Sequence, residues 1–456
     1  MKKLSLAFII LTICTFTYSQ TNPADALTQE EAQAVEKKKR EKKKQGWTFG
    51  ALPIVSYDTD IGFQYGALVN LYKYDSTRYP SYDHSIYAEW SQTTKGSGII
   101  RLAYDSEHLI KGIRLTGDIA YITDKAIDFY GFNGYESVYN QSWEDDEDPD
   151  YISRLFYRHD RKIFRFLADF QGNIYDDKLL WYAGISFMNF KVGSVDVDRL
   201  NEGKPEDQIL QDTSIYQNYV DWGILSPEEA QGGNANYISG GIVYDSRDNE
   251  PNPMKGIWTE LVLRAAPSFM GNKDFGHLKL AITHRQYFTI IPKNLSFAYR
   301  VGFQTTLAGE TSFYAQPMML FSFYRGALPQ GLGGGKTLRG IRRNRVVGST
   351  ILYGNFEFRW KIIHTKLFKQ NLYIALNGFL DAGRTFGEYK TDLSGVPAEI
   401  NISDYFNPGN ENFHLSAGGG VRFALNQNFI VAVDFGKALD RNDGNTGLYI
   451  GLNYLF

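Results

Sequence analysis

The chain has almost no cysteine and, after its first residues, no long apolar run. Among 456 residues there is one cysteine, Cys14, which excludes a disulfide framework within the chain. Beyond the N-terminus no apolar run reaches about 18 residues, so membrane-spanning helices are excluded. The 48 Lys and Arg nearly balance the 51 Asp and Glu. This balance argues against nucleic acid as a partner.

Residues 1–19 have the pattern of a secretory signal peptide. Two lysines precede an apolar segment that ends at Phe16, and small or polar residues follow up to Gln20. Cleavage before Gln20 removes Cys14. A lipoprotein, with Cys14 at the cleavage point, is disfavoured because apolar residues continue after it.

Residues 20–46 are expected to form a short periplasmic segment. The pattern predicts a helix with an acidic start and a basic end, which suits the helix dipole. Its basic run, residues 37–44, is either a solvated helix end or a contact with anionic lipid headgroups.

Aromatic residues and glycine are abundant, with 31 Tyr, 31 Phe and 44 Gly. From Trp47 onward the chain is a succession of segments in which apolar and polar residues alternate, broken by turn residues, and this pattern is typical of strands. We count about sixteen segments, at 47–58, 61–74, 82–94, 97–107, 111–123, 160–174, 179–194, 234–245, 256–268, 277–290, 294–308, 348–362, 369–383, 413–426, 428–439 and 446–456.

Two of these segments show how the faces differ. In 348–362 one face carries Asn355, Glu357 and Arg359, and the other carries Phe356, Phe358 and Trp360. In 446–456 the apolar face is predicted to carry Leu448, Ile450, Leu452, Tyr454 and Phe456. A polar face opposite an aromatic one is typical of a barrel wall with lipid outside and water inside.

The connections between segments predict the topology. Those from odd to even segments include four long ones, at about 124–159, 195–233, 309–347 and 384–412, whereas those from even to odd are short. Outer-membrane barrels have long extracellular loops and short periplasmic turns. We therefore predict an all-β, 16-stranded antiparallel transmembrane barrel over residues 47–456, closed because lipid cannot satisfy an open sheet edge. An even strand count puts both chain ends in the periplasm.

The connection before segment 348–362 carries the most distinctive motif. Its glycine-rich stretch, residues 331–337, leads to Arg339 and Gly340. An arginine inside a barrel needs an acidic partner, whereas on a solvated loop it needs none. The stretch is also a near miss for a phosphate-binding loop, because Gln330 replaces the first glycine and a strand, not a helix, follows.

The motif resembles that of the BamA/TamA-like outer-membrane assembly barrels, the bacterial surface antigen family. The family motif, (I/V/L)-R-G-(F/Y), is matched by Leu338, Arg339, Gly340 and Ile341. The resemblance implies sixteen strands and a sixth loop that folds into the lumen. It also implies that luminal Glu357 and Asp381 hold the arginine. Ile341 departs from the family's aromatic residue, which puts the packing at the loop tip in doubt.

The resemblance further implies insertion or translocation of protein or lipid clients through a seam between the first and last strands. Gly50 and Pro53 in the first strand, with Gly447 and Gly451 in the last, would limit the hydrogen bonds that close the seam, or are ordinary irregularities. The aromatic end of the chain, with Tyr454 and Phe456, resembles the signal recognised in barrel assembly. Residues 20–46 leave no room for the family's periplasmic POTRA domains, so a POTRA-less branch is expected.

Other functions remain as alternatives. A passive pore would require the sixth loop to leave the lumen open. An outer-membrane lipase would require a Ser-His-acid set, and none can be assembled, so no enzymatic activity is expected. The acidic run 144–148 either binds Ca²⁺ or is a solvated loop, and no metal site or cofactor is predicted. The expected partners are outer-membrane lipids or lipopolysaccharide, client outer-membrane proteins, and periplasmic or lipoprotein partners.

Overall fold

A computed structural model describes residues 45–59, 61–75, 82–250, 252–321, 330–367, 370–425 and 429–456. The expected signal peptide, and all but the last two residues of the expected N-terminal segment, lie outside the described residues. No helix within these ranges is long and apolar enough to cross a membrane.

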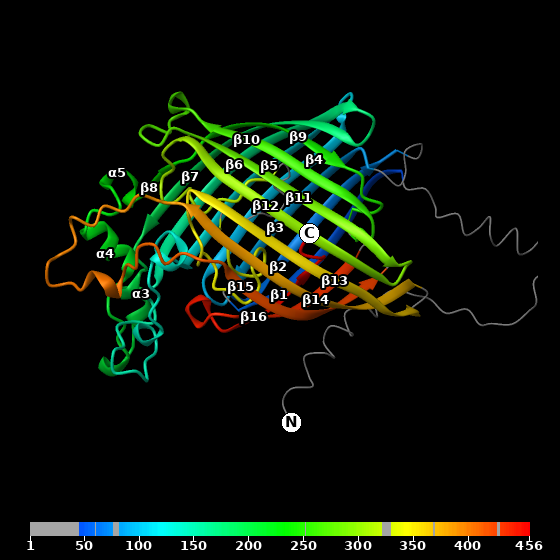
Figure 1. The fold of residues 1–456 in the computed structure, drawn as a ribbon. Coiled ribbons are helices and arrows are strands. Elements are labelled where there is room, and N and C mark those ends of the chain that lie inside the picture. Colours follow the sequence, from blue (N-terminus) through cyan, green and yellow to red (C-terminus); the bar gives the residue numbers. More distant parts are fainter. Residues whose placement is uncertain are drawn as a thin grey trace, which may run out of the picture.

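The strands form one antiparallel sheet that closes on itself, because β1 pairs with β2 on one side and with β17 on the other (Figure 1). The strands are β1 (Gly46–Asp58), β2 (Gly62–Tyr74), β3 (His84–Thr93), β4 (Ser97–Ile110), β5 (Ile113–Asp128), β6 (Arg158–Tyr175), β7 (Leu179–Gly193), β8 (Gly232–Asn234), β9 (Tyr237–Asp245), β10 (Gly256–Ala266), β11 (His277–Ile291), β12 (Leu295–Gly309), β13 (Thr350–Leu367), β14 (Gln370–Gly387), β15 (His414–Leu425), β16 (Phe429–Ala438) and β17 (Thr446–Leu452).

Strands β8 and β9 share one position in the wall, since both pair with β7. Together they correspond to the predicted segment 234–245, so the barrel has the predicted sixteen strand positions. The break between them arises at Asn236, whose side-chain oxygen accepts the Met188 backbone N–H at 3.0 Å. A side chain thus replaces a backbone carbonyl for one step of the ladder.

The two faces of the wall have the predicted chemistry. In β13 the side chains of Phe358 and Trp360 are 56% and 52% exposed, whereas Glu357 and Arg359 are buried. The same alternation in the other strands leaves the outer face apolar and aromatic and the lumen polar, the arrangement of a membrane barrel.

The last strand is shorter than predicted. Residue Asn453 adopts a left-handed backbone conformation (φ 68°), and β17 ends at Leu452. The tail, which we define as residues 453–456, therefore leaves the wall. Tyr454 is buried against Tyr373 and Ile430, so the prediction that Tyr454 and Phe456 share the outward face with Leu448 is wrong.

The four long connections, residues 129–157, 194–231, 310–349 and 388–413, lie at one end of the barrel, which we call the long-loop end. Connections at the other end have ten residues or fewer. Three short helices, α3 (Val197–Asn201), α4 (Ile215–Asp221) and α5 (Pro227–Ala230), project beyond the long-loop end in Figure 1. Short 3₁₀ turns occur at Gly134–Glu136, Gln141–Trp143, Glu206–Gln208, Ser268–Met270, Ile402–Asp404 and Arg441–Asp443.

These connections pack into a hydrophobic cluster that covers the long-loop end, and we call it the dome. Each connection contributes buried side chains, including Phe129, Tyr157, Ile215, Tyr219, Trp222, Phe313, Met318, Val347 and Phe406. Some of its aromatic rings meet edge-on, as Phe129 and Tyr219 do at a centroid distance of 5.5 Å, and others are stacked, as Phe132 and Tyr389 are at 3.8 Å. Such packing favours one fixed arrangement over a set of independent loops.

A buried carboxylate joins three parts of the dome. Glu229 of α5 accepts the Phe313 backbone N–H at 2.6 Å and the Tyr389 hydroxyl at 3.0 Å. Burial raises the pKa of the Glu229 carboxyl above its usual range. The folded dome therefore binds this proton more tightly than the unfolded chain does.

Lowering the pH should stabilise the dome through Glu229. The stabilisation is complete below the ordinary glutamate range, about pH 4, and is lost as the pH rises through the raised pKa. Thermal unfolding of the purified protein, followed by tryptophan fluorescence, should show a higher Tm at pH 5 than at pH 7.5. The Glu229→Gln variant lacks this titration and should gain less. An equal gain in both proteins would contradict the role of Glu229.

Candidate functional site

The described parts of the connection 310–349, residues 310–321 and 330–349, run from the dome into the lumen, and we call them the luminal loop. Its inner part is held together by its own contacts. Leu332 and Val346 form a β-bridge, and the Thr337 hydroxyl bonds to both the N–H and the carbonyl of Gly333. These contacts hold the inner part of the loop in one conformation up to its tip, which we define as residues 335–342.

The two apolar residues of the predicted motif fix the tip against the wall. Leu338 and Ile341 are buried in a cluster with Leu332, Ile351 and Tyr353. Ile341, which replaces the aromatic residue expected from the family, is 1% exposed. The branched side chain therefore packs fully at this position.

The structure brings Arg339 together with both predicted partners. Its Nη1 lies 2.7 Å from Glu357 of β13. Its Nε and Nη2 each lie 2.9 Å from an oxygen of Asp381 in β14, and its backbone N–H donates to the same carboxylate at 3.1 Å. All three side chains are fully buried. A bidentate, charge-assisted contact of this kind is strong and directional.

Two further contacts of Arg339 were not predicted. Asp434 of β16 lies 3.4 Å from its Nη1, and the ring of Phe379 lies 3.5 Å beneath the guanidinium carbon. The alternation of segment 428–439 does put Asp434 on the inner face. However, the sequence offers no sign of which inner carboxylates the curvature of the wall brings to the tip.

The network extends beyond Arg339. Arg422 of β15 forms a bidentate contact with Asp434 at 2.7 and 2.9 Å, and Arg359 of β13 binds Glu357 at 2.8 Å. Three guanidinium groups thus face three carboxylates across β13, β14, β15 and β16. The balance of charge explains how so many ionic groups can be buried together.

Two glycines let the tip reach the wall. A side chain at Gly436 of β16 would place its Cβ 2.5 Å from the Arg339 carbonyl oxygen. Gly340 has φ 95°, and its own Cβ position lies 2.6 Å from the Gly436 carbonyl carbon. The two backbones therefore touch directly, which only glycine permits here.

Two other arginines of the luminal loop, Arg343 and Arg345, are also buried and have partners. Arg343 lies 3.1 Å from Asp128. Arg345 donates to the carbonyls of Gly134 and Ser137 at 2.8 and 3.2 Å. These contacts join the luminal loop to the end of β5 and to the connection 129–157.

The tail occupies the lumen beside this network. Arg359 donates from Nη2 to the Phe456 carbonyl at 2.9 Å, and its guanidinium lies 4.3 and 4.9 Å from the ring centroids of Tyr454 and Phe456. Arg300 lies 5.3 Å from the same Phe456 ring. These cation–π contacts, which alternation along the strand cannot reveal, explain why the aromatic residues turn inward.

The boundary between β1 and β17, the seam, is closed by little pairing. Among the described residues, the register contains only Tyr57 opposite Ile450 and Asp58 opposite Tyr449, with Thr59 hydrogen-bonded to Leu448 beside them. By contrast, all 13 residues of β1 pair with β2.

The predicted seam residues differ in their pairing and in the space around them. Extending the register by four residues would put Pro53 opposite position 454, where the chain has already left the wall. Gly50 and Gly451 have open space at their Cβ positions, whereas Gly447 makes room for the hydroxyl of Tyr449. Only Gly447 has a close packing role in the described structure.

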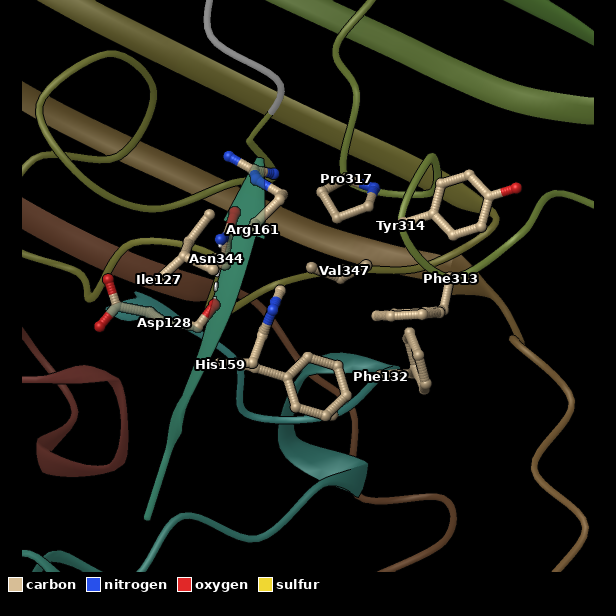
Figure 2. A pocket seen from close by; sticks show the side chains of 12 residues that line it. Ile127, Asp128, Phe132, His159, Arg161, Phe313, Tyr314, Pro317, Asn344 and Val347 are labelled. Atoms are coloured by element: carbon tan, nitrogen blue, oxygen red, sulfur yellow. Dashed lines mark hydrogen bonds between the residues drawn. The ribbon is translucent and has the colours of Figure 1, made fainter. Parts of the chain in front are cut away.

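No group of His, Cys, Asp and Glu in the described residues is arranged to hold a metal ion. In the acidic run 144–148, Glu144 lies 3.4 Å from Arg158. The dome contains a cavity of about 20 Å³, lined by His159, Asn344 and aromatic side chains (Figure 2). Its volume suits about one water molecule.

The closed antiparallel sheet and the buried ion pairs of Arg339 define a membrane-spanning β-barrel with a luminal loop. The chain belongs to the Omp85 superfamily, whose domain matches residues 184–456. The resemblance to BamA/TamA-like barrels is thereby confirmed, and family membership implies the bacterial outer membrane.

Two solved structures are similar in fold. BamA from Haemophilus ducreyi lacking POTRA domains 1–3 is 13% identical with a TM-score of 0.52, over 90% of this chain and 71% of that chain. CdiB from Escherichia coli is 8% identical with a TM-score of 0.51, over 90% of this chain and 63% of that one. No curated protein sequence matches the chain.

Removing either end of the main ion pair should destabilise the barrel. Arg339→Ala leaves buried carboxylates without their cation, and Asp381→Ala leaves the cation short of its bidentate partner, at a cost of about 3–5 kcal/mol each. Arg342→Ala, whose side chain is 27% exposed, should cost about 1 kcal/mol or less. Heat-modifiable gel mobility and urea unfolding would show the difference, and equal stability of the three variants would contradict it.

Gly436→Ala should push the tip off the wall. Its methyl group would overlap the Arg339 carbonyl, and overpacking of this kind costs about 1–3 kcal/mol. Gly451→Ala is the matched control, because nothing lies within 4 Å of its Cβ position. Urea unfolding midpoints of the two variants would be compared; a drop in the control as large as that in Gly436→Ala would refute the close contact.

Proposed function

We propose that the chain is an outer-membrane barrel that inserts or translocates protein or lipid clients through the seam between β1 and β17. The observation that carries the proposal is the difference in pairing on the two sides of β1. Residues 46–56 have partners in β2 but none in the register with β17. This leaves an edge on which an extended client segment can add as a strand.

The energetics favour opening at this boundary over any other. A backbone hydrogen bond contributes about 1 kcal/mol net, and the seam has two register pairs where the β1–β2 boundary has thirteen. Separating β1 from β17 is therefore the least costly break in the wall. Family membership and the fold shared with BamA and CdiB support the same role.

In this proposal the long-loop end faces the cell exterior and both chain ends face the periplasm, as the segregation of loop lengths indicates. The partners would be outer-membrane lipids or lipopolysaccharide, client outer-membrane proteins, and periplasmic or lipoprotein partners. The role is not enzymatic and needs no cofactor.

The alternative, a passive pore, has less support. The luminal loop and the tail lie inside the barrel, and the dome covers one end of it. A pore needs an open path for solutes. Steady, large single-channel openings of the protein in planar bilayers would favour the pore and count against the proposal.

A disulfide across the seam should block the proposed function. Tyr57→Cys with Ile450→Cys joins the two strands at a registered pair, where the Cα separation suits a disulfide. Insertion of an unfolded outer-membrane barrel protein into proteoliposomes should stop under oxidising conditions and recover on reduction. The control pair, Val69→Cys with Ala88→Cys, joins β2 to β3 and should have no effect. Full insertion activity with a locked seam would rule out this route.

A further inference from the structure

The tip of the luminal loop meets the seam at one residue, Tyr449. Tyr449 lies in β17 opposite Asp58 of β1, so it belongs to one of the two register pairs of the seam. Its hydroxyl accepts the Gly340 backbone N–H at 3.0 Å. The residue that follows Arg339 is thus bonded to a seam residue.

The ring of Tyr449 also lies against the tip. A Cβ at Gly335 would lie 2.6 Å from the Cδ1 of Tyr449 and 3.1 Å from a carboxylate oxygen of Asp58. Glycine at this position lets the loop backbone rest on both members of the seam pair. Gly447, two residues earlier on the same face of β17, leaves space for the Tyr449 hydroxyl.

Other contacts of the tip hold the hairpin formed by β16 and β17. Gly340 packs on Gly436 of β16. The Arg342 backbone N–H donates at 2.7 Å to the carbonyl of Asp443, in the connection between the two strands. β17 has only seven residues and is the shortest strand of the barrel apart from β8. Its inner face is therefore braced by the loop, while its seam edge has little pairing of its own.

We propose that Tyr449 is the positioning residue that couples the Arg339 contact to the seam. While Arg339 is held by Glu357 and Asp381, the tip presses Tyr449 into register with Asp58. When the tip leaves the wall, Tyr449 loses its hydrogen bond to Gly340 and the seam loosens. The inference rests on the proposed function only in that the seam opens; it does not depend on what passes through.

Because the chain has only one cysteine, an introduced thiol can serve as a probe of the seam. The single cysteine, Cys14, falls in the expected signal peptide, so an introduced cysteine is the only thiol of the processed protein. Ile450→Cys places it at the registered pair with Tyr57. Labelling of this outward-facing thiol by a membrane-permeant maleimide in nanodiscs then reports seam opening.

In this background Tyr449→Phe should raise the labelling rate about 5-fold, since it removes one hydrogen bond and leaves the Gly340 N–H without its acceptor. Arg339→Ala should raise the rate at least as much. Because both changes act on one connection, the double variant should label no faster than Arg339→Ala alone. Unchanged labelling in Tyr449→Phe, or additive effects in the double variant, would overturn the coupling.

Two controls separate coupling from general loss of stability. Tyr287→Phe alters another buried luminal tyrosine, in β11, whose hydroxyl has no hydrogen-bond partner among the described residues, and should leave the rate unchanged. Ile185→Cys, in β7 on the far wall, should be labelled equally with and without Tyr449→Phe. Faster labelling at this distant site would mean that Tyr449 is merely structural and would refute the proposal.

The client-insertion assay separates this inference from the proposed function. If seam labelling follows the coupled pattern but insertion is absent, the coupling stands and the proposed function falls. If insertion is present but labelling is additive, the function stands and the coupling falls.

Discussion

A buried guanidinium group imposes the main constraint on this barrel. Arg339 is removed from water inside the lumen, and a charge in that position is tolerated only with paired carboxylates and satisfied hydrogen bonds. Glu357, Asp381 and Asp434 supply them from β13, β14 and β16. Because the partners come from different strands, the contact fixes the loop and also the relative positions of the strands that hold it.

The same ionic network joins the two ends of the lumen. Glu357 binds Arg339 from the loop and Arg359 from the wall, and Arg359 in turn binds the tail at Phe456. Since each group partly neutralises the next, removing one member leaves others unpaired. The loop that descends from the dome and the tail that leaves the last strand are therefore parts of one connected interior, not separate plugs.

Against this ordered interior, the seam is the least paired boundary of the wall. Closure needs the first and last strands to meet, yet β17 ends at Leu452 and the tail turns inward. The loop tip contacts this edge from inside through the hydrogen bond between Gly340 and Tyr449. The barrel thus combines strong ionic contacts in the lumen with little hydrogen bonding at one edge of the sheet.

Much of the fold could be read from the sequence, because side chains alternate along a strand with a period of two and the loop lengths segregate. This period places Glu357, Asp381 and Asp434 on the inner face whatever the rest of the chain does. It also indicates that an arginine in the luminal loop needs a carboxylate.

Tertiary structure alone decided which carboxylates meet Arg339, how far β1 pairs with β17, and where Tyr454 and Phe456 point. These depend on the curvature and stagger of the closed wall, which bring distant strands together and have no signature in any local stretch. The tail shows the reason most clearly: its alternation predicts an outward face, but a left-handed turn at Asn453 and the cation of Arg359 draw it inward.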